Sequence, residues 1–351
     1  MATERPRRQE QEKATDEITE VAPGVLRLQL PIELPGLGHV NCYAIEDERG
    51  VALVDPGLPG PKPYQTLKAR VEAAGFPLER VHTVIVTHSH HDHFGGAPQL
   101  AKDTGADIVT HESFRLWWDA GQDGEELIDA PTNADGSLAD PDRRQAPWGG
   151  ERPRPPRRVR VKARVGKLLG RNWWRAPTPT VRLTDAETIK LGGREWVAVH
   201  TPGHTSDHLC LFDPTEGVLL SGDHVLPTIT PHIGGVGMGR DPLLRFFQSL
   251  ERMHTLDGVN HVLPAHGHPF TDLGGRADAI RRHHEERLDK LRKAIDGLGP
   301  SDVTGLSHEL FQPRSWGPMA ESETWAHLEH LRLIGDAERD EVAGRLIYRT
   351  A

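Results

Sequence analysis

Cysteine is nearly absent from this sequence. Cys42 and Cys210 are the only two, and each lies within an apolar run, so we expect buried thiols in a reducing compartment and no disulfide framework. Long apolar stretches are absent too, since none reaches the roughly 18 to 20 residues that a membrane span needs. The first residues are charged where a signal peptide would be apolar. These features predict a cytoplasmic protein without a membrane partner.

An excess of positive charge is also lacking. The formal net charge is −9, which argues against a general nucleic-acid binder. One segment departs from this balance, because residues 143–175 contain many basic side chains and a single acid, Glu151. The basic side chains are Arg143, Arg144, Arg152, Arg154, Arg157, Arg158, Arg160, Lys162, Arg164, Lys167, Arg171 and Arg175.

Histidine, by contrast, is abundant. The chain has 21 histidines, many of them in short clusters beside Asp and Gly, as in THSHHDHFGG. Imidazole and carboxylate groups are costly to bury unpaired, and together they suit a divalent transition metal. The predicted ligands lie in loops that follow apolar strands: His88, His90, Asp92, His93, His204, Asp223 and His266.

The pattern of residues along the chain divides it into segments. Residues 1–19 are polar and are expected to form a flexible tail, and residues 20–274 alternate strand-like and helix-like runs as one main domain. Within that domain, residues 116–184 are rich in Pro, Gly, Arg and Trp and are interpreted as an insertion. Residues 275–351 contain three helical patterns and a strand-like end, which predicts a winged-helix-like C-terminal domain.

The order of the metal-binding motifs is informative. H-x-H-x-D-H, then G-H-T, G-D and H-G, resembles the ordered signature of the metallo-β-lactamase superfamily over about residues 20–272. The C-terminal pattern resembles the glyoxalase II-like subgroup with a winged-helix-like domain. This resemblance implies an α+β fold, a four-layer αββα sandwich of two mixed sheets with helices outside. The metals would lie at one edge of the sandwich.

The resemblance also implies roles for individual residues. The cofactors would be two divalent metal ions, with Zn2+ favoured and Fe or Mn as alternatives. His88, His90 and His204 would hold one ion; Asp92, His93 and His266 would hold the other. Asp223 would bridge them, and Asp92 and Asp223 would be the catalytic carboxylates. Asp55, in VALVDPG, would orient a ligand histidine, although such an Asp also starts turns.

The other histidines are weighed separately. His224 and His232 are candidates for substrate contact, whereas His91 lies between ligands and is interpreted as a bystander. His208 and His268 are weaker candidates. His111 ends a strand and is interpreted as structural. His39 lies near the site by family geometry, with a loop role equally open.

This ligand set predicts a dinuclear metal-dependent hydrolase. Two ions can lower the pKa of a bridging water to near 7, so that a metal-bridged hydroxide attacks an ester-like bond. A thiol leaving group has a pKa of about 8.5 and needs little protonation, so a thioester such as acyl-CoA or acylglutathione is the favoured substrate. The resemblance argues against a main role as a β-lactamase, because the true β-lactamases of this fold lack the bridging Asp.

Other functions stay open. The main alternative is a phosphodiesterase or endoribonuclease acting on single-stranded RNA, for which the basic insertion with Trp173 and Trp174 offers charge and stacking surface. The acidic residues of the third C-terminal helix are expected to repel phosphate: Glu321, Glu323, Glu329, Asp336 and Glu338. Less favoured are a non-catalytic metal-containing sensor and a single-iron persulfide dioxygenase. The expected partner is a small anionic molecule, nucleic acid is not favoured, and a homodimer is one alternative for the oligomeric state.

Overall fold

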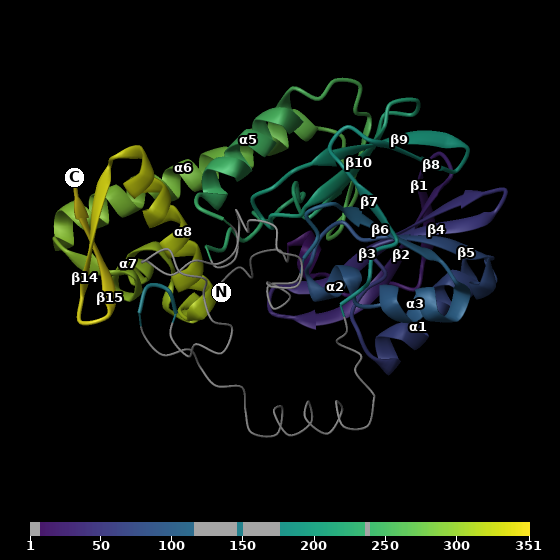
Figure 1. Ribbon diagram of the computed structural model, residues 1–351, viewed down its shortest axis with the longest axis horizontal. Coiled ribbons are helices and arrows are strands. Elements are labelled where there is room, and N and C mark those ends of the chain that lie inside the picture. The colour runs from purple at the N-terminus through teal and green to yellow at the C-terminus, as the bar shows by residue number, and fades with distance from the viewer. Residues whose placement is uncertain (1–7, 116–145, 150–175, 236–238) are drawn as a thin grey trace, which may run out of the picture.

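The computed structural model describes residues 8–115, 146–149, 176–235 and 239–351. Two mixed sheets pack face to face, with helices on the outer side of each (Figure 1). This arrangement confirms the α+β four-layer αββα sandwich. Most of the basic insertion lies outside the described residues, including Trp117, Trp118, Trp173 and Trp174.

The first sheet has the strand order β1-β2-β3-β4-β5-β6-β7, and its bounds are β1 (Ile18–Ala22), β2 (Val25–Leu34), β3 (Leu37–Asp47), β4 (Gly50–Val54), β5 (Val81–Ile85), β6 (Asp107–His111) and β7 (Val181–Leu183). Strands β1 to β4 are antiparallel, whereas β4 to β7 run parallel. Helices α1 (Pro61–Ala73) and α3 (Ala97–Thr104) cover its outer face. β7 lies within the predicted insertion 116–184 and pairs with β6 at the edge of this sheet, and the bounds of the insertion stay a prediction.

The second sheet has the order β12-β11-β10-β9-β8, and its strands are β8 (Thr188–Leu191), β9 (Arg194–His200), β10 (Leu209–Asp213), β11 (Val218–Gly222) and β12 (His261–Pro264). Strands β11 and β12 are parallel and the other pairs are antiparallel. Helices α5 (Pro242–His254) and α6 (Leu273–Leu298) lie on its outer face. The side chain of Asp241 accepts a hydrogen bond from the Leu244 amide and caps α5.

Three apolar clusters hold the layers together. One lies between the sheets, where Tyr43 and Ile85 of the first sheet pack near Trp196 and Leu211 of the second. The other two lie between each sheet and its helices. Strands with apolar side chains on both faces can be buried only when both faces are covered, which is why the four layers form.

The C-terminal part consists of α6, α7 (Val303–Leu310), α8 (Pro318–Ile334), and a small antiparallel sheet in the order β13-β15-β14. The strands are β13 (Ser301–Asp302), β14 (Ala337–Val342) and β15 (Arg345–Thr350). The sequence predicts three helices and a strand-like end here. The winged-helix-like C-terminal domain stays a prediction. One apolar cluster contains Val199 and Phe246 of the sandwich together with Leu306 and Tyr348 of this part.

The acidic residues of α8 and β14 do not form an unpaired face. Glu323 contacts Arg287, and the Glu329 carboxylate lies 2.8 Å from the Arg332 guanidinium. The other predicted acids also have partners: Glu321 with Trp148, Asp336 with Arg292, and Glu338 with Arg349. Each of these acids therefore has a hydrogen-bond or ion-pair partner within the protein, and the expected repulsion of phosphate stays a prediction.

Part of the predicted flexible tail is instead fixed in the fold. Residues Gln9–Gln11 form a short 3-10 helix, and Glu10 is fully buried. The Glu10 carboxylate accepts hydrogen bonds from the amides of Thr228 (2.8 Å) and Ile229 (3.1 Å). The segment around Gln9–Gln11 is therefore attached to a loop beyond β11, because Glu10 satisfies the backbone donors of that loop.

Two predictions from the missing features can be compared with the structure. Cys42 and Cys210 are both buried and free, which confirms the expectation of unpaired thiols. Among the described residues, no helix is long and apolar enough to cross a membrane.

Candidate metal centre

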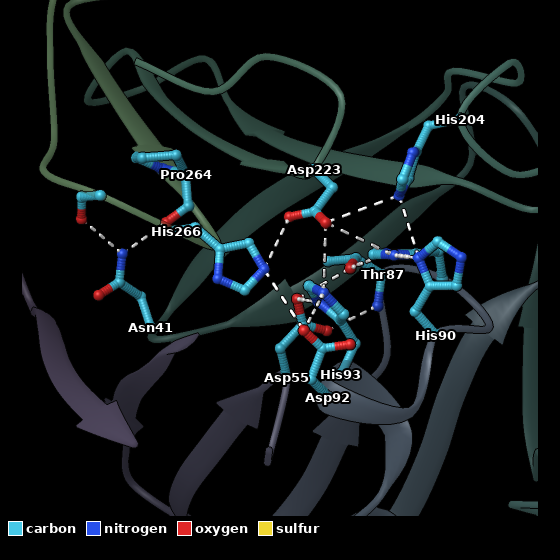
Figure 2. A network of polar contacts seen from close by, with 12 residues as sticks. Asn41, Asp55, Thr87, His90, Asp92, His93, His204, Asp223, Pro264 and His266 are labelled. Atoms are coloured by element: carbon cyan, nitrogen blue, oxygen red, sulfur yellow. Dashed lines mark hydrogen bonds and ion pairs between the residues drawn. The ribbon is translucent and has the colours of Figure 1, made fainter. Parts of the chain in front are cut away.

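The predicted ligands meet at one edge of the two sheets (Figure 2). The loop after β5 carries His88 and His90, and the short helix α2 (His91–Phe94) that follows it carries Asp92 and His93. His204 follows β9, Asp223 follows β11 and His266 follows β12. Because the loops at the ends of neighbouring strands share an edge, side chains from distant parts of the sequence converge there.

The first group comprises His88, His90, His204 and Asp223, whose candidate ligand atoms all lie within 4.8 Å of one another. The Nδ1 atom of His90 lies 2.9 Å from Nε2 of His88 and 3.0 Å from Nε2 of His204. The nearer oxygen of Asp223 lies 3.6 Å from Nε2 of His204. Three imidazole nitrogens and one carboxylate therefore face a common point.

The second group comprises Asp92, His93 and His266, again with candidate ligand atoms within 4.8 Å. Oδ2 of Asp92 lies 3.5 Å from Nε2 of His266 and 3.7 Å from Nε2 of His93. Asp223 also faces this group, since its oxygens lie 3.3 Å from Nε2 of His266 and 3.5 Å from Nε2 of His93. Asp223 is thus the carboxylate between the two groups.

The polar atoms of this cluster fit a divalent cation. Nε2 of His93, Nε2 of His266 and Oδ1 of Asp223 are buried and have no hydrogen-bond partner among the residues that the structure describes. Such groups are costly to bury without a partner. Burial alone would lower the pKa of His93, but the carboxylates of Asp55, Asp223 and Asp92 raise it well above its usual value. The ion pairs of Asp92 and Asp223 within the described residues are all with histidine. The two His/Asp groups are therefore suited to metal binding.

Asp55 is linked to one histidine of each group, directly to His93 and through the Thr87 hydroxyl to His88. Its Oδ2 lies 2.8 Å from Nδ1 of His93 and accepts a hydrogen bond from the Thr87 hydroxyl at 2.8 Å. That hydroxyl lies 3.0 Å from Nδ1 of His88. The backbone of Asp55 has a φ of 55°, a strained conformation that Asp tolerates better than most residues. This is the geometry that an orienting role requires, since Nδ1–H is held and Nε2 faces inward.

His266 is fixed through the backbone of β3. Its Nδ1 donates to the carbonyl of His39 at 2.6 Å, which places His39 beside the site. The side-chain amide of Asn41 donates to the carbonyls of Pro264 (2.8 Å) and Gly267 (2.9 Å), on either side of His266. Asn41 is not among the predicted site residues, although a polar amide within the apolar run HVNCYAIE is an available signal.

His232 and His208 each contact a predicted ligand. The carbonyl of His232 accepts from Nδ1 of His204 at 2.8 Å. The side chain of His232 is 29% exposed, and its Nδ1 lies 3.1 Å from Glu323. His208 accepts a hydrogen bond from the amide of Asp223 at 3.0 Å, so this weaker candidate holds the backbone beside the cluster.

The remaining candidates lie around the cluster or away from it. His224 is fully buried and packs edge-on against Phe246 at 5.1 Å, so its burial disfavours the predicted substrate contact. His91 lies on α2, with its ring 5.2 Å from Phe94. His111 stacks on His200 at 3.8 Å, and His268 lies 2.8 Å from a carboxylate oxygen of Glu12. None of these four joins the two groups.

Comparison with known proteins places this geometry in a family. The model of the metallo-beta-lactamase superfamily matches residues 35–296. In a solved structure, a metallo-beta-lactamase family protein from Thermus thermophilus has a TM-score of 0.72 and 27% identity, covering 95% of this chain and 100% of that one.

Two named enzymes are among the similar sequences. A hydroxyacylglutathione hydrolase of Idiomarina loihiensis is 25% identical over 269 residues, covering 74% of this chain and 76% of that protein. An atrochrysone carboxyl ACP thioesterase of Aspergillus fumigatus is 25% identical over 260 residues, covering 74% of this chain. The match spans 45% of that thioesterase, and 63% of an uncharacterized Bacillus subtilis relative that is 30% identical over 192 residues.

Proposed function

Because the chain belongs to the metallo-β-lactamase superfamily, we propose that it is a dinuclear metal-dependent hydrolase of thioesters. In this proposal His88, His90 and His204 hold one divalent ion, and Asp92, His93 and His266 hold the other. Asp223 binds both. The favoured metal is Zn2+, because imidazole and carboxylate donors in this number suit it. The observation that carries the proposal is the buried donor set that faces one carboxylate from two sides.

When bound, two such ions lower the pKa of a shared water to near 7 and polarise a substrate carbonyl. The protein's own residues prepare the donors. Asp55 and the carbonyls of His39 and His232 hold the Nδ1–H groups of ligand histidines. Each of those rings would then offer its Nε2 to a bound ion as the ligand atom. Burial alone would raise the pKa of Asp223, but His266 and His93 hold it well below its usual value, so this carboxylate stays ionised.

The cysteines do not supply a competing nucleophile. Burial raises the pKa of Cys210 to about 12, and Cys42 is also fully buried with a raised pKa. A thiol in that state is inert because the thiolate is the nucleophile. Among the described cysteines, no group is therefore prepared to form an acyl-enzyme, which favours direct attack by water.

A thioester is favoured over an amide because its leaving group needs little protonation. The named relatives support an ester-like bond: one is called a hydroxyacylglutathione hydrolase and another an ACP thioesterase. Acylglutathione, acyl-CoA and an acyl carrier protein thioester are the substrates to be compared. Each would enter as an anionic molecule.

The test is a turnover assay of metal-analysed protein against these thioesters and a single-stranded RNA. The same protein, stripped with a chelator and then reconstituted with Zn2+, is the matched control. We expect thioester cleavage that is lost on stripping and returns with metal, and no cleavage of RNA. Metal-dependent RNA cleavage with inert thioesters would replace this proposal by an endoribonuclease.

A further inference from the structure

Helix α8 holds a segment that touches the metal centre. Residues 232–235 lie against it, with the Gly235 amide 3.4 Å from the Ser322 hydroxyl. The ring of Trp325 lies so close to Gly235 that a Cβ there would come within 2.4 Å of it. At the start of the segment, Nδ1 of His232 lies 3.1 Å from Oε2 of Glu323. The C-terminal part thus contacts this segment through three side chains.

The position of His232 matters because its carbonyl faces the cluster. Nδ1 of His204 donates to that carbonyl at 2.8 Å, while Nε2 of the same ring lies 3.0 Å from His90. The carbonyl therefore fixes both the tautomer and the orientation of the His204 ring. Any movement of residue 232 would turn the ring away from its group.

Glu323 is itself held firmly. It is 6% exposed, and its Oε1 contacts a guanidinium nitrogen of Arg287 on α6. The two oxygens of one carboxylate thus serve different purposes, one binding α6 and the other His232. A buried carboxylate with two such partners is fixed in place, since both its charge and its lone pairs are satisfied.

The same carboxylate belongs to a third group of candidate metal donors, with His284 and His327. Arg287 already supplies the positive charge there, so a divalent ion would be repelled. Nδ1 of His327 donates to the carbonyl of Glu323 at 2.7 Å, and its Nε2 lies 3.0 Å from Nδ1 of His284. This pattern is that of a hydrogen-bonded core, and it leaves Glu323 free to act on His232.

We propose that Glu323 is a positioning residue for the metal centre, holding His232 so that its carbonyl orients His204. This inference rests on the proposed two-metal function. It assigns the C-terminal part a direct role in forming the site, in addition to packing. The effect is expected on the ion held by His204, because His266 is oriented from β3 and His93 by Asp55, directly after β4.

The chain offers a matched control in Glu329. This residue also lies on α8, is 8% exposed, and is paired with Arg332 and Arg339. Its partners belong to the C-terminal part alone, and Tyr348 donates to its carboxylate. Glu329→Ala therefore disturbs a comparable buried ion pair on the same helix without touching residue 232.

The experiment compares wild type, Glu323→Ala, Glu323→Gln and Glu329→Ala. Each is titrated with a competing chelator while bound metal is counted, and the absorption spectrum of the Co2+-loaded protein is recorded. We expect Glu323→Ala to release one of two ions about 10 to 100 times more readily and to change the Co2+ spectrum. Glu323→Gln, which keeps an oxygen for His232, should lose less, and Glu329→Ala should match wild type.

The outcomes separate the two proposals. If wild type binds no metal, the proposed function fails and the inference with it. If wild type binds two ions and Glu323→Ala retains both with unchanged affinity and spectrum, only the inference is overturned. It is also overturned if Glu329→Ala weakens the same ion equally, or if wild type binds a third ion that Glu323→Ala loses. If Glu323→Ala does not fold, the comparison of Glu323→Gln with Glu329→Ala decides in the same way.

Discussion

The described part of the chain contains two largely buried clusters of histidine and carboxylate. One is at the edge of the sheets around Asp223, and the other lies between α6 and α8 around Glu323. The donors around Asp223 form two groups and those around Glu323 form one, and within each group the candidate ligand atoms lie within 4.8 Å of one another. By residue type and spacing alone, each could be a metal site.

The clusters differ in their counter-charge. Glu323 contacts Arg287, so its negative charge is neutralised within the protein. Asp223 is 6% exposed, and its ion pairs within the described residues are all with histidines, which can be neutral. A buried carboxylate needs a cation. The comparison teaches that the lack of an Arg or Lys partner among the described residues, more than the donor set, distinguishes the candidate metal centre.

The largest effect is expected from removing the central carboxylate. Asp223→Ala takes a donor from both groups, so bound metal should fall from two ions to one or none, with turnover reduced by about 10³-fold or more. Metal analysis and thioester assays measure both. His91→Ala, from the same loop as four of the ligands, is the control and should keep most of each. Unchanged metal content and turnover in Asp223→Ala would refute the central role of this residue.

In the second cluster, removing the cation should mainly affect stability. Arg287→Met leaves Glu323 buried without its charge partner, which should lower the free energy of unfolding by about 3 to 5 kcal/mol. Denaturant unfolding measures this. The double variant Arg287→Met with Glu323→Gln should be less destabilised, because no unpaired charge is buried. A loss below about 1 kcal/mol in the single variant would show that the pair does not carry this role.

A smaller effect on metal affinity is expected from Asp55, which contacts a predicted ligand without belonging to either group. Asp55→Asn keeps the size of the side chain but removes the charged acceptor of His93 and Thr87. Metal affinity should fall by about 10- to 100-fold, as measured by competition with a chelator. Asp103→Asn, on the exposed side of α3 where Asp103 pairs with Tyr64 and Gln99, is the control. Equal affinity in the two variants would contradict the orienting role of Asp55.

The smallest effect is expected in the response of the second cluster to acid. Burial lowers the pKa of His327 to about 4, so its neutral form stabilises the fold. That stabilisation is complete above the unfolded pKa of about 6.5 and is lost as the pH falls toward 4.

Between pH 7.5 and 5 the loss from His327 should be about 2 kcal/mol. Unfolding at the two pH values should therefore show a weaker pH dependence in His327→Gln than in wild type. His254→Gln changes a half-exposed histidine on α5 and should keep the wild-type dependence. Identical pH dependence in His327→Gln and His254→Gln would argue against a buried neutral His327.

Much of the site could be predicted from the sequence because its donors are local. His88, His90, Asp92 and His93 share one loop, and the other ligands each follow an apolar strand that could be recognised. The four layers were implied by the family resemblance that these motifs carry. Helix α5 is not among the predicted elements, although Asp241 and Pro242 mark its start, because the Gly-rich stretch before it is typical of a continuing loop.

What the sequence could not provide was pairing over long separations. Glu323 looks like one of several exposed acids on a helix until Arg287, 36 residues earlier, is placed beside it. Glu10 looks like part of a charged tail, and its two backbone partners are more than 200 residues away. Charge patterns along the chain do not report such partners, because burial is decided by the tertiary fold.

The apolar cluster that joins Phe246 on α5 to Leu306 and Leu328 in the C-terminal part has a consequence for how such proteins diversify. A domain that shares its apolar core with its neighbour cannot be replaced by the corresponding domain of a relative, because the differing side chains would leave cavities at the interface. The two parts are therefore expected to unfold in a single transition and to be inherited together. Chimeras between relatives should remain folded only where α5 and α8 come from the same parent.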